Sequence, residues 1–365
     1  MSEARSEEHR RRQAGARGVL KMTERAFKLT MDLRTAQKRN RRFRKINIAA
    51  NAIGGDQPGA KKRIMTFEPL YLKTARKGQL LPKINEARRI LSECILCPRN
   101  CRVDRKSGEL GECRTGEEAT VSSFNAHFGE EPPLVGVSGS GTIFFTHCSL
   151  KCSFCQNFDI SQQGAGDEFS TAQLATTMLI LQNAGCHNIN LVTPTHVIPQ
   201  ILSALYMAID GGLSIPLVYN SSGYDNVQSL RLLDGVVDIY MPDFKFWDPA
   251  VAELTCSAPE YPEAARQALK EMHRQVGDLQ MNAEGLAQRG LIIRHLVLPG
   301  GMAGTREIMS FIVAELSDNS YVNLMDQYRP CGLAGQIPGL AQSLSRKQFE
   351  KAMAEARAAG IRQFA

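Results

Sequence analysis

Three cysteines at a fixed interval behind an apolar run constrain this chain more than any other feature. The run Gly141-Thr142-Ile143-Phe144-Phe145 has the composition of a short buried strand, and Cys148, Cys152 and Cys155 follow it with C-x3-C-x2-C spacing. A loop at the end of such a strand can turn three sulfurs toward one object, and soft thiolates select iron–sulfur clusters, zinc or copper(I). Structural zinc sites and electron-transfer clusters normally have a fourth protein ligand. Three thiols therefore indicate a cluster with one iron left open for a substrate or cofactor.

Two simpler interpretations exist for these three thiols. His147 could complete a zinc knuckle, or the three could be ordinary core cysteines. Core cysteines have no reason to fall at this interval directly behind a strand, so the cluster is preferred.

A second set of cysteines precedes the first. Residues 84–92 read as a short helix that leads into Cys94, Cys97, Cys101 and Cys113, with Gly108 and Gly111 available for a tight loop. Four thiols can complete a tetrahedral shell, and the metal would stabilise a segment that has no core of its own. Spacing alone does not separate a second 4Fe-4S cluster from zinc. The other three cysteines, Cys186, Cys256 and Cys331, are expected to be packing residues.

The charge is unevenly distributed along the chain. Residues 1–90 hold 24 Lys and Arg against 8 Asp and Glu, whereas the remainder holds 20 against 29. The basic run Lys38–Lys45 and the turn-prone segment Gly54–Gly59 predict a basic, disordered extension over 1–64, with a helix expected over residues 20–45. An arm for RNA, DNA or an acidic partner is the alternative, but a nucleic-acid partner is not expected. The composition of the sequence changes at Met65. We therefore divide the chain into 1–64, a metal module over 65–130, and a catalytic part over 131–365.

The sequence also indicates a compartment. It contains no stretch approaching the roughly 20 apolar residues of a membrane span, and its start, Met1-Ser2-Glu3, has no signal-peptide pattern. Seven of its ten cysteines fall in two tight sets, which fits metal binding in a reducing compartment better than a disulfide framework. We therefore expect a cytoplasmic protein with no membrane partner.

From residue 135 onward, strand patterns alternate with helix patterns. The expected strands cover 142–146, 188–193, 215–220, 236–242, 291–298 and 321–327, and the expected helices cover 171–184, 198–210, 305–316 and 346–358. This alternation predicts parallel strands joined by right-handed crossovers. Six repeats rather than eight predict the fold class α/β, as a partial (β/α)6 TIM-like barrel with an N-terminal cysteine-rich metal module.

Polar residues gather where these strands end. Reactive residues of such barrels lie at the C-terminal ends of the strands, so we expect this group to converge above the three-cysteine loop. The candidates are Thr193, Thr195 and His196 after the second strand, Asn220, Ser221 and Ser222 after the third, Asp243 and Lys245 after the fourth, Arg294 and His295 in the fifth, and Asp326 and Gln327 after the sixth. Each one alone could equally be a loop cap.

The motifs taken together resemble a known superfamily. The three-cysteine motif, with Phe154 before its last member, resembles the signature of the radical S-adenosylmethionine (radical SAM) enzymes. From Met65 to the C-terminus the chain is similar to activating enzymes related to pyruvate formate-lyase activating enzyme, and to their PflX-like branch. The strings that carry this likeness are the Cys94-to-Cys113 set, Tyr219–Tyr224, Asp238–Lys245 and Arg294–Gly300.

The resemblance implies a chemistry. Cys148, Cys152 and Cys155 would ligate a 4Fe-4S cluster that receives one electron from a reductant protein and passes it to bound S-adenosylmethionine. The resulting 5′-deoxyadenosyl radical would take a hydrogen atom from the substrate, which in activating enzymes is a protein such as a glycyl radical enzyme. The residues implied for the cofactor are Lys245 for its carboxylate, Asn220, Ser221 and Ser222 for its ribose, Asp243 with Met241 for a cation, and Arg294 and His295 beside them.

Two departures separate this chain from those enzymes. Their Gly-Gly-Glu string is replaced by Val192-Thr193-Pro194-Thr195, which leaves Thr193 and Thr195 as candidates for the cofactor's amino group. Their additional cysteines follow the three-cysteine motif, whereas Cys94 to Cys113 precede it. Two other functions therefore stay open: radical SAM modification of a small molecule or another macromolecule, and a non-catalytic iron–sulfur protein that transfers electrons or acts as a sensor.

Overall fold

The computed structural model describes residues 67–365. The chain divides into two units, Met1–Met65 and Thr66–Ala365, and the second unit carries both cysteine sets. The helix predicted over 20–45 and the basic extension predicted over 1–64 lie outside the described residues.

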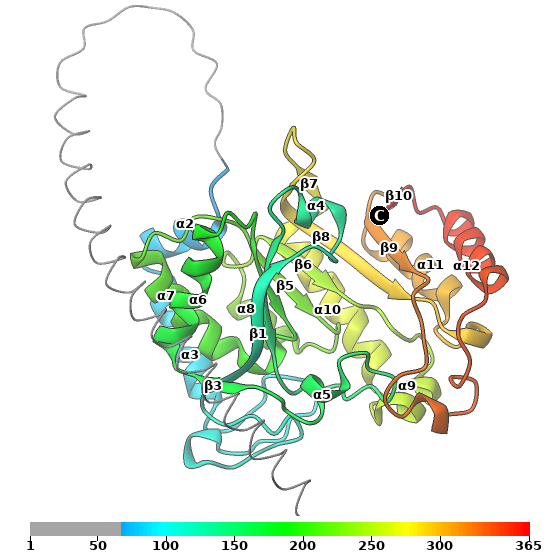
Figure 1. The fold of residues 1–365 in the computed structure, drawn as a ribbon, viewed down its shortest axis with the longest axis horizontal. Helices are drawn as coiled ribbons and strands as arrows, with labels where there is room; N and C mark the ends of the chain where they lie inside the picture. Colours follow the sequence, from blue (N-terminus) through cyan, green and yellow to red (C-terminus); the bar gives the residue numbers. More distant parts are fainter. Residues whose placement is uncertain (1–66) are drawn as a thin grey trace, which may run out of the picture. The chain divides into compact units, whose positions relative to one another are not determined.

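One large sheet runs through the second unit (Figure 1). Its strands follow the order β10-β9-β8-β6-β5-β4-β2-β1-β3, and neighbours from β2 to β10 pair in parallel. The six predicted strands correspond to β2 (Ser140–Phe145), β4 (Ile189–Val192), β5 (Leu217–Ser221), β6 (Ile239–Pro242), β8 (Ala287–Leu296) and β9 (Tyr321–Met325). The predicted parallel α/β sheet is therefore confirmed.

Four further strands were not anticipated. β1 (Ala119–His127) and β3 (Asp167–Phe169) extend the sheet antiparallel beyond β2, β7 (Gln280–Met281) pairs with β8, and β10 (Gln363–Phe364) adds a short parallel edge. Within residues 67–365 no pairing joins β3 to β10, so the sheet is open and does not close into a barrel.

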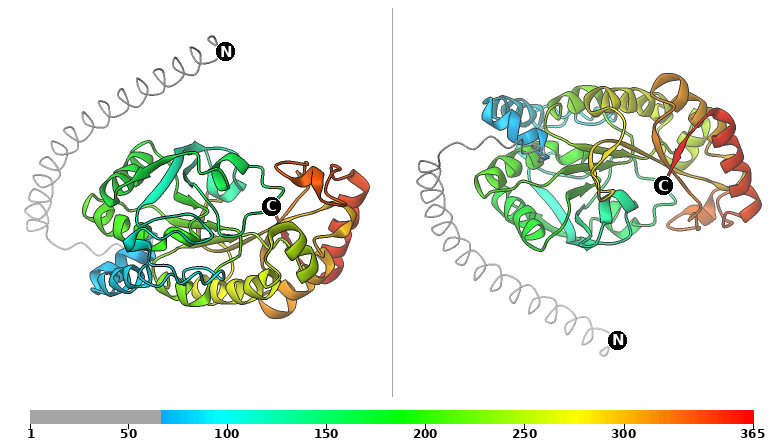
Figure 2. Two further views of the ribbon diagram at one scale, coloured as in Figure 1. Left: turned by 90° about the horizontal axis from the view of Figure 1, so that it is seen from below. Right: turned by 90° about the horizontal axis from the view of Figure 1, so that it is seen from above.

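The helices pack outside the strands, as the end views in Figure 2 show. The predicted helices correspond to α3 (Leu80–Ile90), α6 (Thr171–Asn183), α7 (Ile198–Asp210), α11 (Thr305–Glu315) and α12 (Arg346–Ala359). Ser170 forms a capping box with Gln173 at the start of α6, and Ser345 forms one with Gln348 at the start of α12. Helices not anticipated are α2 (Leu70–Arg76), α4 (Pro132–Val135), α5 (Phe158–Ser161), α8 (Val227–Leu232), α9 (Pro249–Cys256) and α10 (Tyr261–Val276).

The two faces of the sheet are lined differently. Successive side chains of a strand point to opposite faces, so Leu191, Tyr219 and Tyr240 join the large core beneath the helices. Their neighbours on the other face, Val218 and Met241, belong to a separate apolar cluster. This inner cluster consists of Leu134, Val218, Ile239, Met241, Ala287, Ile292 and Tyr321. Two residues further along their strands, the inner face turns polar at Asn220, Asp243 and Arg294.

The segment that carries the second cysteine set has little regular structure. It is held by backbone hydrogen bonds from Cys94 N to Val103 O (3.0 Å) and from Arg102 N to Cys94 O (2.9 Å). The fully buried guanidinium of Arg105 donates to Gly116 O and, at 2.8 Å, to His196 O just beyond β4. The segment is thus attached to the strand ends on one side of the sheet.

Nothing in the described part of the chain resembles a membrane span, because none of its helices is both long enough and apolar enough.

Candidate functional site

A cavity of about 410 Å³ lies at the C-terminal ends of the parallel strands. It is lined by all three thiols of the first set and by most of the polar residues predicted at the strand ends. The predicted residues on its wall are Cys148, Cys152, Cys155, Thr193, Asn220, Ser221, Ser222, Asp243, Lys245, Arg294 and Gln327. The sheet therefore brings together groups that the sequence spreads over 180 positions, as parallel strands do when their carboxyl ends meet.

The loop that carries the three thiols curls by means of two left-handed residues. His147 (φ 63°) and Lys151 (φ 56°) adopt a backbone conformation that is uncommon outside glycine and is enriched at functional sites. The loop is fixed at both ends by hydrogen bonds from His147 N to Ile160 O (2.9 Å) and from Ser153 N to Thr255 O (2.9 Å). This anchoring holds the sulfurs toward the cavity.

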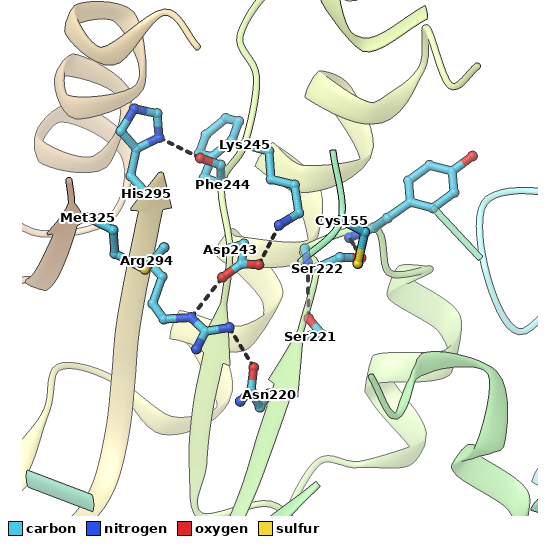
Figure 3. Close-up of polar contacts among 12 residues, drawn as sticks. Cys155, Asn220, Ser221, Ser222, Asp243, Phe244, Lys245, Arg294, His295 and Met325 are labelled. Carbon is cyan, nitrogen blue, oxygen red and sulfur yellow. Dashed lines mark hydrogen bonds and ion pairs between the residues drawn. The ribbon is translucent and has the colours of Figure 1, made fainter. Parts of the chain in front are cut away.

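A buried charge network forms the opposite wall of the cavity (Figure 3). Asp243 Oδ2 accepts a hydrogen bond from Lys245 Nζ at 2.6 Å, and Asp243 Oδ1 accepts one from Arg294 Nε at 2.7 Å. Arg294 Nη2 donates to Asn220 Oδ1 at 2.8 Å. Gly223 fits here because any side chain at that position would collide with the Asp243 carbonyl oxygen. Three strands, β5, β6 and β8, thus contribute to one network.

The ion pairs keep all three members charged. Burial alone would raise the pKa of Asp243, but Arg294 and Lys245 outweigh it and lower that pKa. Burial would likewise lower the pKa of Lys245, and Asp243 raises it instead. Lys245 has three donors and Asp243 takes one of them, so the ammonium can bind a further anion.

Four of the predicted strand-end residues do not line the cavity: Thr195, His196, His295 and Asp326. The ring of His196 is buried, and its Nε2 lies 2.9 Å from Thr146 O. Thr195 donates at 2.7 Å to the buried carboxylate of Asp225, behind the sheet. His295 also points away from the cavity: its Nδ1 lies 2.6 Å from Phe244 O and its Nε2 lies 3.0 Å from Thr305 Oγ1. Figure 3 shows this ring turned toward Phe244 and away from Arg294. Burial lowers the pKa of His295 to about 4, so the ring is neutral at pH 7.

Two of the ribose candidates are already engaged. Ser221 Oγ donates to Asp225 at 2.6 Å and accepts from Gly223 N at 3.1 Å. Asn220 uses its oxygen for Arg294, which leaves its amide nitrogen as the free group. Ser222 makes a weaker contact, accepting from Tyr224 N at 3.4 Å. Asn220 and Ser222 therefore keep more capacity for a ligand than Ser221.

The sequence did not predict an acidic group on the inner face of the sheet. Glu130 lines the cavity, and its carboxylate lies 3.5 Å from Arg294 Nη1; Glu131 lies 3.9 Å from the same atom. Burial raises the pKa of Glu130 to about 7 despite the nearby Arg294. Glu131 Oε2 is buried without a partner, and the buried side chain of Asn190 on β4 lies beside Glu130. In the sequence, Asn190 in the otherwise apolar strand β4 was the indication that this part of the inner face is polar.

The three thiols line one cavity, but within the described residues they are not grouped around a single ion. Four thiolates on a single zinc lie about 3.8 Å apart, given bonds of about 2.3 Å in a tetrahedron. Among residues 67–365 no three Cys, His, Asp or Glu side chains are arranged to hold a single metal ion. Cys148, Cys152 and Cys155 nevertheless face the same cavity, as ligands placed around the corners of a cluster would. His147 does not line this cavity, which weakens the zinc-knuckle alternative.

The four thiols of the second set are neighbours of one another. Cys97 is buried, and its pKa is raised by burial and by the nearby Cys113, Cys94 and Cys101. Cys101 Sγ accepts a hydrogen bond from Glu112 N at 3.4 Å, and a side chain at Gly111 would collide with Cys101. In the arrangement described, these four thiols are not grouped around a single point.

The remaining cysteines lie mostly in packed positions. Cys186 and Cys256 are buried. Cys256 is also a hydrogen-bond neighbour of Cys152, and this contact raises the pKa of the Cys152 thiol further than burial does. It therefore lies directly behind the first cysteine set.

Among the solved structures that are partly similar to this chain are a methyltransferase and a synthase. A radical SAM methyltransferase from Sphaerobacter thermophilus aligns with a TM-score of 0.42 at 15% identity, over 61% of this chain and 65% of that one, just under two thirds of its length. Methylornithine synthase (PylB) aligns with a TM-score of 0.41 at 12% identity, over 79% of this chain and 71% of that one. Scores at this level are too low to establish a common fold.

Comparison of the sequence is more decisive. No family model matches the chain. An uncharacterized protein of Methanocaldococcus jannaschii, MJ0674, is 34% identical over 281 residues, which cover 74% of this chain and 76% of that protein. Identity of this extent over most of both chains shows common descent, and the chain belongs to the family of the Methanocaldococcus jannaschii protein MJ0674.

Proposed function

We propose that the protein is a radical SAM iron–sulfur enzyme. One observation carries the proposal: three thiols at C-x3-C-x2-C spacing share a cavity with a buried, ion-paired Lys245 and Arg294 at the ends of parallel strands. An electron carrier needs a closed ligand shell and has no need of a polar cavity beside it. A non-catalytic iron–sulfur protein would therefore account for the thiols but not for the cavity.

Cys148, Cys152 and Cys155 would hold a 4Fe-4S cluster, and the cavity beside them would hold S-adenosylmethionine. When bound, the pair supplies a 5′-deoxyadenosyl radical after one-electron reduction, and this radical abstracts hydrogen from the substrate. The cavity of about 410 Å³ is within the range of small-molecule sites.

The residues of this chain orient the cofactor and exclude water. Lys245 has donors free for a carboxylate, and it stays charged because Asp243 holds it. Asn220 Nδ2 and Ser222 Oγ offer hydrogen bonds to ribose hydroxyls. Thr193, which is left-handed (φ 61°) and lines the cavity, is the remaining candidate for the amino group, since Thr195 is bonded to Asp225.

The contacts to the cofactor do not identify the substrate. Our first proposal is the activation of a protein by hydrogen abstraction, as in the activating enzymes that the motifs resemble, with a one-electron reductant protein as second partner. Modification of a small molecule is the alternative. Incubation with a deuterated candidate separates the two, because deuterium transfers to 5′-deoxyadenosine only from the true substrate.

We further propose that Cys94, Cys97, Cys101 and Cys113 bind metal, as a second cluster or zinc, and that the protein works in the cytoplasm. The mutual proximity of the four thiols supports the metal. Iron and zinc counts on Cys94→Ala and Cys97→Ala variants distinguish the two, since loss of a second cluster halves the iron and loss of zinc leaves it constant.

The test of the main proposal is cleavage of S-adenosylmethionine by anaerobically reconstituted, full-length protein. Addition of dithionite should yield 5′-deoxyadenosine and methionine. Cys155→Ala should abolish this cleavage, whereas Cys186→Ala, which removes a buried thiol outside the cavity, should retain it. A reconstituted protein with a reducible cluster and no 5′-deoxyadenosine would support the electron-transfer alternative instead.

A further inference from the structure

Arg99 connects the two cysteine sets. It lies between Cys97 and Cys101 of the second set, but its side chain extends to the loop of the first. Its Nε donates to Ser149 O at 3.0 Å, and its Nη2 donates to Leu150 O at 3.4 Å. The same guanidinium donates to the carbonyl oxygens of Cys256, at 2.8 Å, and Ser257 at the end of α9. A side chain of the second set therefore holds the backbone between Cys148 and Cys152.

The two carbonyls that Arg99 binds fix the direction of two peptide planes. In a trans peptide the N–H of the next residue points opposite to the carbonyl, and the described chain contains no cis peptide. With the oxygens of Ser149 and Leu150 on Arg99, the N–H groups of Leu150 and Lys151 point the other way. Both of these N–H groups are hydrogen-bond partners of Cys148.

The other end of Arg99 contacts the second set directly. Its own backbone N–H is a hydrogen-bond partner of Cys97. One residue thus contacts a sulfur of the second set through its backbone and orients the amides on a sulfur of the first set through its side chain.

A second link between the sets is weaker. Lys151 Nζ lies 2.7 Å from Glu112 Oε2, next to Cys113, but both side chains are substantially exposed. An exposed ion pair contributes little to stability and is screened by salt. Arg99, in contrast, makes four hydrogen bonds to carbonyls and lies 5.4 Å from the centre of the Tyr224 ring. It is the stronger of the two connections.

We infer that Arg99 is a positioning residue that sets the reduction potential of the cluster at Cys148, Cys152 and Cys155 and couples it to the second cysteine set. The inference rests on the proposed function, which supplies the cluster. Hydrogen bonds from N–H groups to cluster sulfurs, and positive charge nearby, stabilise the more negative reduced state and raise the potential. Removing Arg99 releases both peptide planes and removes the charge, so both effects move the potential to more negative values.

The first experiment is a redox titration, followed by electron paramagnetic resonance, of full-length reconstituted protein. Arg99→Gln should lower the equilibrium constant for cluster reduction about tenfold, a shift of about 59 mV for one electron, with unchanged iron per chain. Arg102→Gln is the matched control, because Arg102 is in the same loop but forms only an exposed ion pair with Glu93. A potential for Arg99→Gln equal to that of the control overturns the inference.

A second experiment needs no cluster. In iron-free protein, Arg99→Gln should speed amide hydrogen exchange in a peptide that covers residues 149–152, and Arg102→Gln should not. Exchange at the wild-type rate would show that Arg99 does not hold these planes. Wild-type protein that binds no cluster would instead contradict the proposed function, so the two failures are distinguishable.

Arg99→Lys covers the case in which Arg99→Gln does not fold. Lysine keeps the charge but cannot make four hydrogen bonds in the fixed geometry of a guanidinium. Its potential should lie between those of wild type and Arg99→Gln, with faster exchange over 149–152. A wild-type potential in Arg99→Lys would show that charge alone is responsible, and would overturn the positioning role.

Discussion

The Asp243 carboxylate accepts a 2.7 Å hydrogen bond from Arg294 Nε between the neighbouring strand ends of β6 and β8. Its second oxygen binds Lys245, so one buried anion holds two buried cations. The two residues are also joined through the backbone, since Phe244 N donates to Arg294 O at 2.8 Å. Both side chains and backbone therefore join the two strand ends in this wall of the cavity.

Asp243→Asn should be strongly destabilising. The change leaves Lys245 and Arg294 buried without their counter-charge, and breaking a buried pair from one side costs about 3–5 kcal/mol. Urea unfolding of the purified variant measures this loss. Asp210→Asn, at an exposed position at the end of α7, should change stability by no more than about 0.5 kcal/mol. Similar losses in the two variants would contradict the role given to Asp243.

Glu130 should make stability fall as the pH rises from about 4.5 to about 7. Its pKa is raised in the folded protein, so the folded state keeps a proton that the unfolded chain has already released in this window. The shift corresponds to about 3 kcal/mol, present as a cost above pH 7 and absent below 4.5. Glu130→Gln should flatten this part of the profile. Parallel profiles for the two proteins would show that Glu130 does not titrate there.

His295 should act in the opposite direction. Its pKa is lowered to about 4 by burial, so its stabilising contribution is complete above pH 6.5 and is lost as the pH falls toward 4. Nδ1 carries the proton because Phe244 O only accepts, and Nε2 accepts from Thr305. His295→Gln should lower stability at pH 7 and reduce its change between pH 6.5 and 4, by up to about 3 kcal/mol. An unchanged acid slope, measured by urea titration, would refute this.

Lys245→Gln should weaken binding of S-adenosylmethionine about tenfold or more. The substitution removes a charge-assisted hydrogen bond to a carboxylate, which is worth about 1.5–3 kcal/mol. Equilibrium binding to the reconstituted protein measures the effect. Lys270→Gln is the control, because Lys270 lies in an exposed ion pair with Glu315 on the far side of the helices. Equal affinities in wild type and Lys245→Gln would remove Lys245 from the cofactor site.

The sequence was sufficient for the parallel sheet, because buried parallel strands appear as short apolar runs separated by helices of regular length. Helix α7 was predicted to the residue, since Ile198 and Pro199 mark its start and Gly211 follows its end. The helices between 249 and 276 were missed. In α10, Leu269, Met272 and Val276 do have helical spacing, but an additional helix between two strands breaks the simple alternation on which the prediction depended.

The site was predictable only where residues follow strand ends. Asn220, Asp243 and Lys245 reach the cavity because they stand at the last inward position or just past it. Thr195 and His295 also stand near strand ends, but the period of two turns His295 to the helix side, between Arg294 and Leu296 on the cavity wall. Glu130 comes from a loop before the first parallel strand, and no local pattern predicts where such a loop folds back. Arg99 was missed for the same reason.

The inner apolar cluster beneath the charge network limits how a large molecule can enter the cavity. Leu134 of α4 packs with Val218, Ile239 and Ile292 and is fully buried. The cavity is therefore closed on the side of this cluster. A polypeptide or nucleic acid strand cannot pass through the cavity from one side to the other. Under the proposed function, a macromolecular substrate would therefore have to present a free end or a hairpin to the cavity.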